Sequence, residues 1–336
     1  MSRVLCCGSF VCDLVAAGIP RVGEPGEIIY APRGIELSVG GHAANVSIDL
    51  VQLGHSNVAA AGCMGEDVFG DYIERELRHR GIDVYAERLG DFRTAKNMAL
   101  VVEGEDRRFI AELAANTMLS VGYVLSSLDD ARPDLFYLGT VGGLRFIDQS
   151  LSKVLDAARG RGCTTVVDVV MPEDEGWGHL TEALPLIDVI HCNIRESNAL
   201  TGKSDPGLAA DMLIDGGVGL IAITSGSRGL TAATEDTKLQ MPAFKVDSLD
   251  PTGAGDAFCA GVIHGLLSES MKRKYLPTAP QEVLKRILLE GAAAGAMCVT
   301  AAGATKAVTR DLVDKLVREQ GEDIMKAVKI TSRTPQ

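Results

Sequence analysis

Hydrophobic and polar residues follow two different patterns along this chain. From about residue 114 onward, short runs that are apolar throughout alternate with longer stretches whose apolar residues recur at helical spacing. The short runs predict buried strands at 135–138, 165–170, 189–192 and 220–224. The longer stretches predict helices at 148–160, 207–215, 281–300 and 310–327. This alternation favours an α/β fold with a doubly wound, mostly parallel sheet flanked by helices.

The first 113 residues combine the same pattern with a strand-rich one. Buried strands are predicted at 4–8 and 58–62, and helices at 44–53 and 72–80. Glycine and proline divide residues 18–38 into short pieces that predict strands at 27–30 and 36–39, and residues 94–110 predict a hairpin around a turn at 103–106. We therefore expect a core domain of residues 1–15, 39–82 and 114–330 and a small β-sheet lid of residues 16–38 and 83–113.

Composition and charge exclude several classes of protein. The chain has 336 residues, 46% of them hydrophobic, which is enough for one large core or two domains. Its formal net charge of −12 argues against a nucleic-acid partner, because nucleic acids favour a basic face. No run of about 18 apolar residues predicts a membrane span. The eight cysteines form no C-x-x-C pair, which favours reduced thiols in a cytoplasmic protein.

The segment from Gly253 to Asp256 carries the strongest chemical signal. Two glycines open an apolar run at helical spacing, and the unpaired N–H groups at a helix start bind phosphate well. Asp256 lies in the first turn, where it could accept a proton from a hydroxyl that attacks a bound phosphoryl group. The helix N-terminus should keep this carboxylate ionised. Taken alone, the segment also fits a plain turn before a helix that begins with an acid.

Two further sites precede it in the chain. Asp13 follows the first predicted strand, and ligands collect at the carboxyl ends of such strands, although a simple turn acid is an equal alternative. Gly40 and Gly41 lead into a helix that carries Asn45, whose amide can both donate and accept hydrogen bonds. These glycines could let a substrate approach the backbone, or the helix start could simply need small residues.

Polar residues also follow two of the later strands. Asn193 and Glu196 come after 189–192 and could hold a hydrated Mg²⁺, although Glu196 alone is more typical of a surface helix acid. Thr224 ends the strand at 220–224, and Gly226 and Gly229 come directly after it.

These segments together resemble the ribokinase-like, or phosphofructokinase-B, family of carbohydrate and nucleoside kinases. Residues 40–54 are similar to the N-terminal signature of the family, and residues 250–256 are similar to its C-terminal signature. Asn193-x-x-Glu196 and the segment 224–229 match further family elements in the expected order. The resemblance extends from about residue 4 to residue 325.

The resemblance implies ATP-dependent phosphorylation of a hydroxyl group, with a β-sheet lid over the substrate. Asp256 would be the general base, and the backbone of Gly253, Ala254, Gly255 and Asp256 would form an anion hole. The implied substrate residues are Asp13, Gly40, Gly41, Asn45 and Asp256. The implied nucleotide residues are Asn193, Thr224, Gly226, Gly229, Gly253 and Gly255, with Asn193 and Glu196 holding Mg²⁺ through water. Some members of the family bind K⁺, and Asp250 and Gly303 occupy the matching stretches. Lids of this family often pair, which implies a homodimer.

Three classes of function remain open at this stage. A sugar or polyol kinase is the first, and an aromatic content of 4% mildly favours it because few rings could stack on a base. A nucleoside kinase on the same fold is the alternative. A ligand-binding regulator without turnover is the third, although such a protein has no need of Asp256. Arg107 and Arg108 could reach an acidic sugar from the lid hairpin or form a solvated hairpin end.

Overall fold

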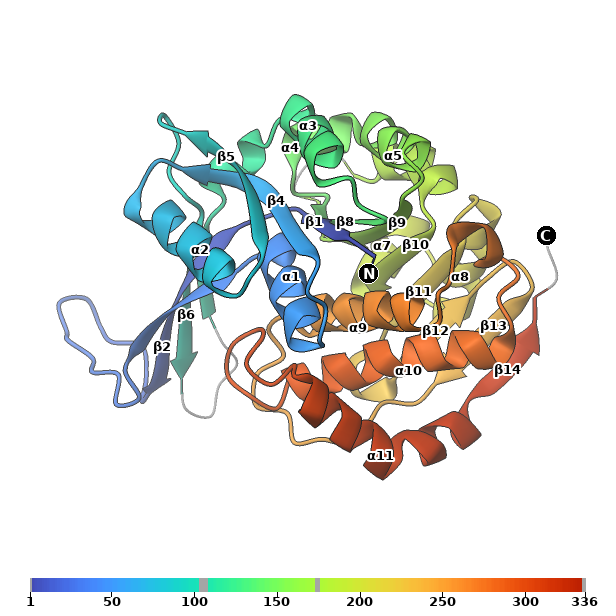
Figure 1. The fold of residues 1–336 in the computed structure, drawn as a ribbon. Coiled ribbons are helices and arrows are strands. Elements are labelled where there is room, and N and C mark those ends of the chain that lie inside the picture. Colours follow the sequence, from blue (N-terminus) through green and yellow to red (C-terminus); the bar gives the residue numbers. More distant parts are fainter. Residues whose placement is uncertain (1, 103–107, 173–175, 334–336) are drawn as a thin grey trace.

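The strands form two separate sheets. The computed structural model describes residues 2–102, 108–172 and 176–333. Within them, ten strands make one large sheet in the order β14-β13-β12-β11-β10-β9-β8-β1-β4-β5, and four make a small sheet (Figure 1). The strands of the large sheet are β1 (Val4–Cys7), β4 (Val58–Gly65), β5 (Asp83–Leu89), β8 (Leu135–Val141), β9 (Thr164–Val169), β10 (Val189–Asn193), β11 (Leu220–Thr224), β12 (Leu230–Ala233), β13 (Thr237–Met241) and β14 (Lys329–Ser332).

The large sheet is mostly parallel, as the sequence predicts. Every neighbouring pair from β5 through β11 is parallel. The strands β12, β13 and β14 extend the sheet in antiparallel order, and the hydrophobic pattern did not reveal them. Parallel strands place their carboxyl ends at one edge of the sheet, where ligands of α/β proteins bind.

Helices cover both faces of the large sheet (Figure 1). Alternate residues of β1 show the division, since Val4 and Cys6 belong to one buried cluster and Leu5 and Cys7 to another. The first cluster packs against α1 (His42–Gln52), α9 (Ala254–Ser268), α10 (Gln281–Cys298) and α11 (Arg310–Ala327). The second packs against α3 (Val121–Ala131), α5 (Leu151–Gly160), α6 (Gly178–Ala183) and α8 (Pro206–Asp215). The remaining α-helices are α2 (Val68–His79), α4 (Arg145–Gln149) and α7 (Ile194–Thr201), and short 3₁₀ turns occupy Ala114–Met118, Leu184–Leu186, Gly226–Arg228 and Arg273–Tyr275.

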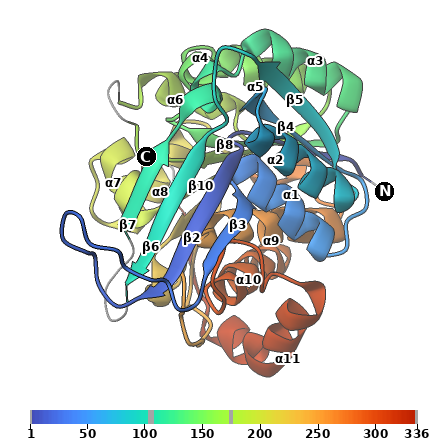
Figure 2. The same ribbon diagram turned by 90° about the vertical axis from the view of Figure 1, so that its left-hand side faces the viewer.

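The small sheet combines a long strand near the start of the chain with the predicted hairpin (Figure 2). Its order is β3-β2-β6-β7, from β2 (Val11–Ile19), β3 (Ile35–Gly40), β6 (Lys96–Val102) and β7 (Arg108–Glu112). The strands β6 and β7 pair antiparallel, which confirms the hairpin, while its expected turn at 103–106 lies outside the described residues. The strands β2 and β6 pair in parallel and join the two parts.

The membership of the small sheet differs from the expected lid in three places. Residues 27–30 are not a strand: Ile28 and Tyr30 of this glycine- and proline-flanked segment are 75% and 78% exposed, while Ile29 packs against the cluster of Ala16, Ile19 and Val102. The strand β2 begins at Val11, so Asp13 belongs to the small sheet and not to the core. The strand β5 pairs with β4 at the edge of the large sheet, where partial exposure gives it a pattern like that of a lid strand.

All eight cysteines are free and buried. Burial raises the pKa of the Cys7 and Cys63 thiols to about 12 and that of Cys163 to about 11. Among the helices of the described residues, none has the length and apolar character needed to cross a bilayer.

Candidate active site

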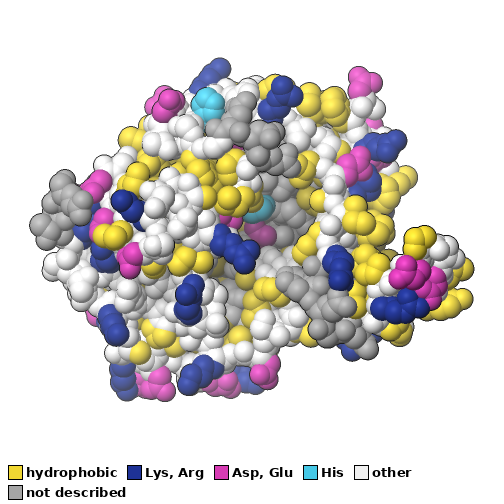
Figure 3. Space-filling view, turned by 180° about the vertical axis from the view of Figure 1, so that it is seen from behind, with side chains coloured by type: hydrophobic (Ala, Val, Ile, Leu, Met, Phe, Trp, Pro, Cys, Tyr) yellow, Lys and Arg dark blue, Asp and Glu magenta, His cyan; other side chains and the backbone are white. Residues whose placement is uncertain are grey.

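A cleft of about 690 Å³ opens at the carboxyl edge of the parallel strands. Its walls come from the ends of β9, β10 and β11, the first turns of α1 and α9, and the strands β2, β6 and β7 of the small sheet. A space-filling view shows a hollow in one face of the molecule, with a histidine and an acidic side chain inside it (Figure 3). The cleft therefore lies between the two sheets.

Asp256 lies in this cleft, in the first turn of α9. Gly253 precedes the helix with a φ of 79°, and a Cβ there would lie 2.5 Å from the Cβ of Ala304, so the turn requires glycine. The Asp256 side chain is buried, and its Oδ2 accepts a hydrogen bond from Asn45 Nδ2 at 2.8 Å. Its Oδ1 is buried and has no hydrogen-bond partner among the described residues.

Burial raises the pKa of Asp256 above its ordinary value. The nearby His42 and the Asn45 hydrogen bond oppose this effect, whereas the negative charge of Asp168 adds to it. The sequence suggested the opposite direction, because the helix N-terminus favours an ionised carboxylate. Loss of water around the carboxylate outweighs that effect, so Asp256 is a stronger proton acceptor than an exposed aspartate.

Asp13, Gly40 and Gly41 meet on the side of the small sheet. Asn97 Nδ2 donates a hydrogen bond to Asp13 Oδ1 at 3.1 Å, and burial raises the pKa of Asp13. A Cβ at Gly40 would collide with Asp13 Oδ2. Gly41 has a φ of 91°, and a Cβ there would lie 2.5 Å from the carbonyl oxygen of Ser9. The two glycines therefore let the end of β3 and the start of α1 pack closely against residues 9–13.

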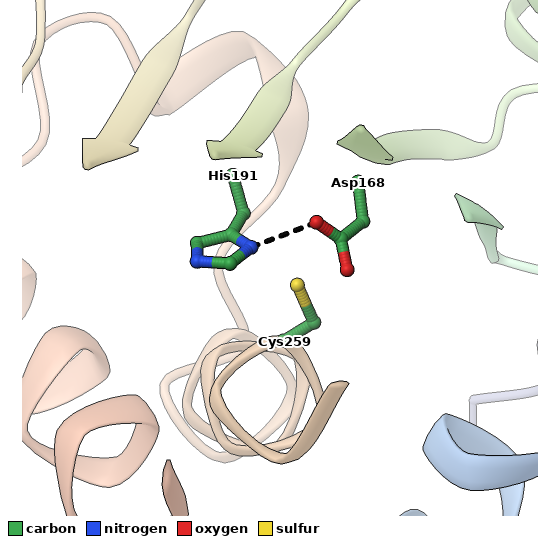
Figure 4. Close-up of side chains that lie close together, drawn as sticks. All are labelled: Asp168, His191 and Cys259. Carbon is green, nitrogen blue, oxygen red and sulfur yellow. Dashed lines mark hydrogen bonds and ion pairs between the residues drawn. The ribbon is translucent and has the colours of Figure 1, made fainter. Parts of the chain in front are cut away.

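A buried ionic pair, Asp168 and His191, lies near Asp256. Asp168 Oδ1 and His191 Nδ1 are 2.8 Å apart, and Tyr137 donates its hydroxyl to Asp168 Oδ2 at 3.2 Å. Figure 4 shows this pair at the ends of two neighbouring strands, with Cys259 of α9 facing it. Burial opposes the charges, but the pairing dominates: the pKa of Asp168 is lowered and that of His191 is raised.

Asn193 and Glu196 form a helix cap at the edge of the cleft. Asn193 Oδ1 accepts from the backbone N–H of Arg195 at 2.8 Å and of Glu196 at 3.1 Å, and Glu196 Oε2 accepts from the N–H of Asn193 at 2.7 Å. This capping box begins α7. Both residues also line the cleft, and burial raises the pKa of Glu196. The three-residue spacing of Asn193 and Glu196 thus has a structural role of its own, as a helix cap, independent of metal binding.

A second pocket, of about 460 Å³, adjoins the cleft. The two share Thr224, Pro251, Ala254 and Gly255, so they meet at the start of α9. Gly226 and Gly229 line the second pocket, where Phe244 and Phe258 provide an apolar surface. Gly229 has a φ of 89°, and a Cβ there would collide with the carbonyl oxygen of Met241.

Asp250 and Gly303 are also brought together. Asp250 Oδ2 accepts from the N–H of Gly303 at 3.0 Å, and Oδ1 accepts from the N–H of Thr252 at 2.9 Å. The carboxylate therefore links the segment before α9 to the segment after α10.

Several cleft residues were not found from the sequence. They are His42, Lys96, Asn97, Asn116, Asp168 and His191. Asp168 lies inside the strand predicted at 165–170, and an acid within an otherwise apolar run was a usable signal. Lys96 and Asn97 face the cleft only because β6 pairs with β2, which no local pattern shows. Of the two arginines considered for an acidic sugar, Arg107 lies outside the described residues and Arg108 is exposed on β7.

Comparison with known proteins identifies the family. Residues 1–310 match the family described as pfkB family carbohydrate kinase, so the chain belongs to this family and is a carbohydrate kinase. It is 27% identical to the Arabidopsis thaliana protein named "Probable fructokinase-7" over 94% of this chain and 92% of that one. It is 26% identical to a ribokinase of Haemophilus influenzae over 78% and 84% of the two chains. An aminoimidazole riboside kinase of Salmonella typhimurium is 27% identical over 80% and 84%.

Solved structures share the fold. A fructokinase from Xylella fastidiosa with bound ATP superposes with a TM-score of 0.79 at 23% identity, covering 95% of this chain and 99% of that one. An Escherichia coli structure described as a ribokinase II in complex with ATP and Mg²⁺ gives a TM-score of 0.76 at 22% identity, covering 95% and 100%. The predicted family and the predicted fold class are both confirmed.

Proposed function

We propose that this protein transfers the γ-phosphoryl group of ATP to a hydroxyl group of a sugar or polyol. The observation that carries the proposal is the position of Asp256: a buried carboxylate at a helix N-terminus where two pockets meet, with one oxygen that no described residue hydrogen-bonds. One pocket would hold the nucleotide and the other the acceptor. Their shared boundary is the place where a γ-phosphate and a hydroxyl would come together.

Asp256 acts as the general base in this proposal. The acceptor hydroxyl gives its proton to the carboxylate as its oxygen attacks the γ-phosphorus, and the bond from phosphorus to the β–γ bridging oxygen breaks. The backbone N–H groups at the start of α9, from Gly253 to Asp256, stabilise the charge on the transferring group. The raised pKa of Asp256 favours proton transfer.

The acceptor lies against the small sheet, which we infer acts as a lid. Asp13 and Asn45 would bind hydroxyl groups, and Gly40 and Gly41 would allow close approach of the sugar. The small sheet contributes Lys96, Asn97 and Glu112 to the same wall, with Lys96 Nζ paired to Glu112 at 2.8 Å. A lid here would exclude water, which competes with the sugar as an acceptor.

The nucleotide lies in the second pocket. Thr224, Gly226 and Gly229 would contact it, Asn193 would lie near its phosphates, and Phe244 and Phe258 supply apolar surface for a base. The E. coli structure with ATP and Mg²⁺ supports these cofactors. Glu196 fits an outer contact to Mg²⁺ through water, since one of its oxygens is occupied in the capping box. When bound, Mg²⁺ would neutralise phosphate charge. K⁺, where it binds, would lie near Asp250 and Gly303.

A nucleoside kinase is the alternative. The 27% identity to an aminoimidazole riboside kinase favours it, because that name describes a ribosyl acceptor that carries a ring. Phe109 of the small sheet also lines the cleft, where a base could contact it.

We also infer a homodimer that forms through the outer face of the small sheet. Asp13, Asn97 and Ala111 face the cleft, so their neighbours in the strands face outward. Pairing aligns Leu37, Leu14, Met98 and Ile110 in one row across all four strands. Leu37, Met98 and Ile110 are 41%, 44% and 66% exposed. A second copy could cover this apolar row.

The test is ADP release from ATP and Mg²⁺ with fructose, ribose, 2-keto-3-deoxygluconate, myo-inositol, adenosine and cytidine as acceptors. Asp256→Asn is the control. A signal on one sugar or polyol that Asp256→Asn abolishes supports the proposal. A signal only on nucleosides supports the alternative. Binding of ATP and sugar without turnover would contradict both and support a ligand-binding regulator.

A further inference from the structure

His42 lies next to the proposed base. Its side chain is 24% exposed and lines the cleft, in the first turn of α1. His42 Nε2 is 3.8 Å from Asp256 Oδ1 and 4.0 Å from Asp168 Oδ2. Both distances are too long for a hydrogen bond. One oxygen atom placed between His42 Nε2 and Asp256 Oδ1 would be within hydrogen-bond distance of both.

Contacts with Thr140 and Ser9, on the side of the ring away from Asp256, fix the orientation of His42. Its Nδ1 is 2.9 Å from Thr140 Oγ1, and its backbone N–H donates to Ser9 Oγ at 3.1 Å. Ser9 Oγ and Thr140 Oγ1 are 2.8 Å apart, and the backbone N–H of Ser9 also donates to Thr140 Oγ1 at 3.3 Å. Thr140 Oγ1 accepts from the Ser9 N–H, and its hydroxyl can donate to His42 Nδ1 when Nδ1 carries no hydrogen. In this arrangement Nε2 carries the hydrogen, as the two facing carboxylates also favour.

Thr140 holds this position in a strained backbone conformation. Its φ is 63°, in the left-handed region that β-branched residues avoid. It lies in β8 where the register with β9 shifts between Leu138 and Val141. Strain of this kind persists only where the surroundings impose it, and it is frequent at functional sites. Here the strained residue directs its hydroxyl toward His42.

We propose that His42 is a second catalytic residue, whose Nε2–H holds the oxygen of the acceptor hydroxyl against Asp256 Oδ1. This inference rests on the proposed function. The hydroxyl donates its hydrogen to Asp256 and accepts a hydrogen bond from His42, which leaves one lone pair to attack phosphorus. The P–O bond forms with that pair, the bridging P–O bond breaks toward ADP, and the proton remains on Asp256. His42 fixes the direction of attack and does not change its own protonation.

The inference predicts a separation of kcat from KM. In His42→Ala, we expect kcat to fall about 10- to 100-fold, as misplacement of a reacting group does, while the acceptor KM changes by less than about 3-fold. A water molecule can occupy the vacated position, so the ratio of phosphorylated acceptor to ADP should also fall. His42→Gln places an N–H near the position of Nε2 and should recover most of the lost kcat. Thr140→Val keeps the shape, removes the hydroxyl and should lower kcat about 3- to 10-fold.

The experiment compares wild-type protein, Asp256→Asn, these three variants and Thr201→Val. Thr201 is a buried threonine of α7 whose hydroxyl donates to the carbonyl of Ser197, so its variant measures the general cost of losing such a hydroxyl. Product and ADP are quantified together, and thermal melting confirms that each variant folds. Unchanged kcat in His42→Ala, or equal losses in the Ala and Gln variants with an unchanged product ratio, would overturn the inference alone. No turnover by wild type would overturn the proposed function and the role of His42 with it.

Discussion

Replacing Asp256 by asparagine should separate activity from stability. General bases contribute about 10²- to 10⁴-fold to rate, or about 2.7 to 5.4 kcal/mol of transition-state stabilisation. Asp168 is a second carboxylate, and one of its oxygens lies within 4.8 Å of an oxygen of Asp256. It is a poor substitute, because its pairing with His191 lowers its pKa. We therefore expect the upper part of the range, a loss of at least about 10³-fold in kcat.

The same variant should be at least as stable as the wild type at neutral pH. Burial raises the pKa of Asp256 in the folded protein above the ordinary value of 3.8. At a pH above the raised pKa, the ionised carboxylate therefore destabilises the folded state. At a pH well below 3.8 the carboxyl group is protonated in both the folded and the unfolded state, and the effect disappears. The Tm of Asp256→Asn should therefore equal or exceed that of the wild type at neutral pH, with the difference shrinking as pH falls. Asn45 can still donate to the amide oxygen of the new side chain.

Three measurements check this reasoning. Coupled ADP release gives kcat, calorimetry gives nucleotide affinity, and melting from pH 4 to pH 8 gives Tm. Nucleotide affinity should stay within about 3-fold, because the carboxylate faces the acceptor side of the boundary. A variant that kept more than a tenth of wild-type kcat would refute the role of Asp256 as base, and a Tm lowered at pH 8 would refute the account of its burial.

Three further predictions follow from the glycines and from the small sheet. Gly253→Ala should lower kcat at least about 10-fold and lower the free energy of unfolding by about 1–3 kcal/mol. The reason is that the new Cβ collides with Ala304 and that alanine is strained at a left-handed φ. Activity assays and urea unfolding measure the two effects. Gly229→Ala should raise the KM for ATP more than the KM for the acceptor, because the collision with Met241 displaces the wall of the second pocket; steady-state kinetics with each substrate varied test it. Ile110→Lys should shift the protein from dimer to monomer in light scattering, because it charges the apolar row.

Matched substitutions control for general effects of these changes. Gly122→Ala adds a methyl group on α3 where nothing lies within 4 Å, and it should be neutral or stabilising without altering kcat. Val68→Lys charges a 74% exposed apolar residue of α2 and should leave the oligomeric state unchanged. Equal effects of Gly253→Ala and Gly122→Ala, or of Ile110→Lys and Val68→Lys, would contradict the proposed roles.

The parallel part of the large sheet could be predicted because its strands are buried on both faces and appear as short, continuous apolar runs. The antiparallel extension could not, since polar residues interrupt the apolar runs of β12 (LTAA) and β13 (TKLQM) and β14 is mostly exposed. The strand β5 was assigned to the lid because an edge strand with partly exposed side chains has the same pattern wherever it pairs.

Residues of the candidate site could be predicted where one short segment contains both a glycine turn and an acid in the first turn of the following helix. Gly253 to Asp256 is such a segment, and Asp13 could be placed because it follows the first strand. Asp168 and His191 could not be paired in advance, because they lie on different strands and meet only through the register of β9 and β10. His42 was visible in the sequence, but its role depends on the conformation of Thr140.

The burial of all eight cysteines makes the thiols a measure of unfolding. A thiolate must form and meet the reagent before alkylation, and the raised pKa values and burial prevent both in the native state. Exposure of these thiols requires opening of the cores that flank the sheets. After brief alkylation, mass spectrometry would therefore separate native molecules, which carry no label, from unfolded molecules, which carry eight labels. The same measurement would report how ligands change the rate of opening, and it needs no engineered probe.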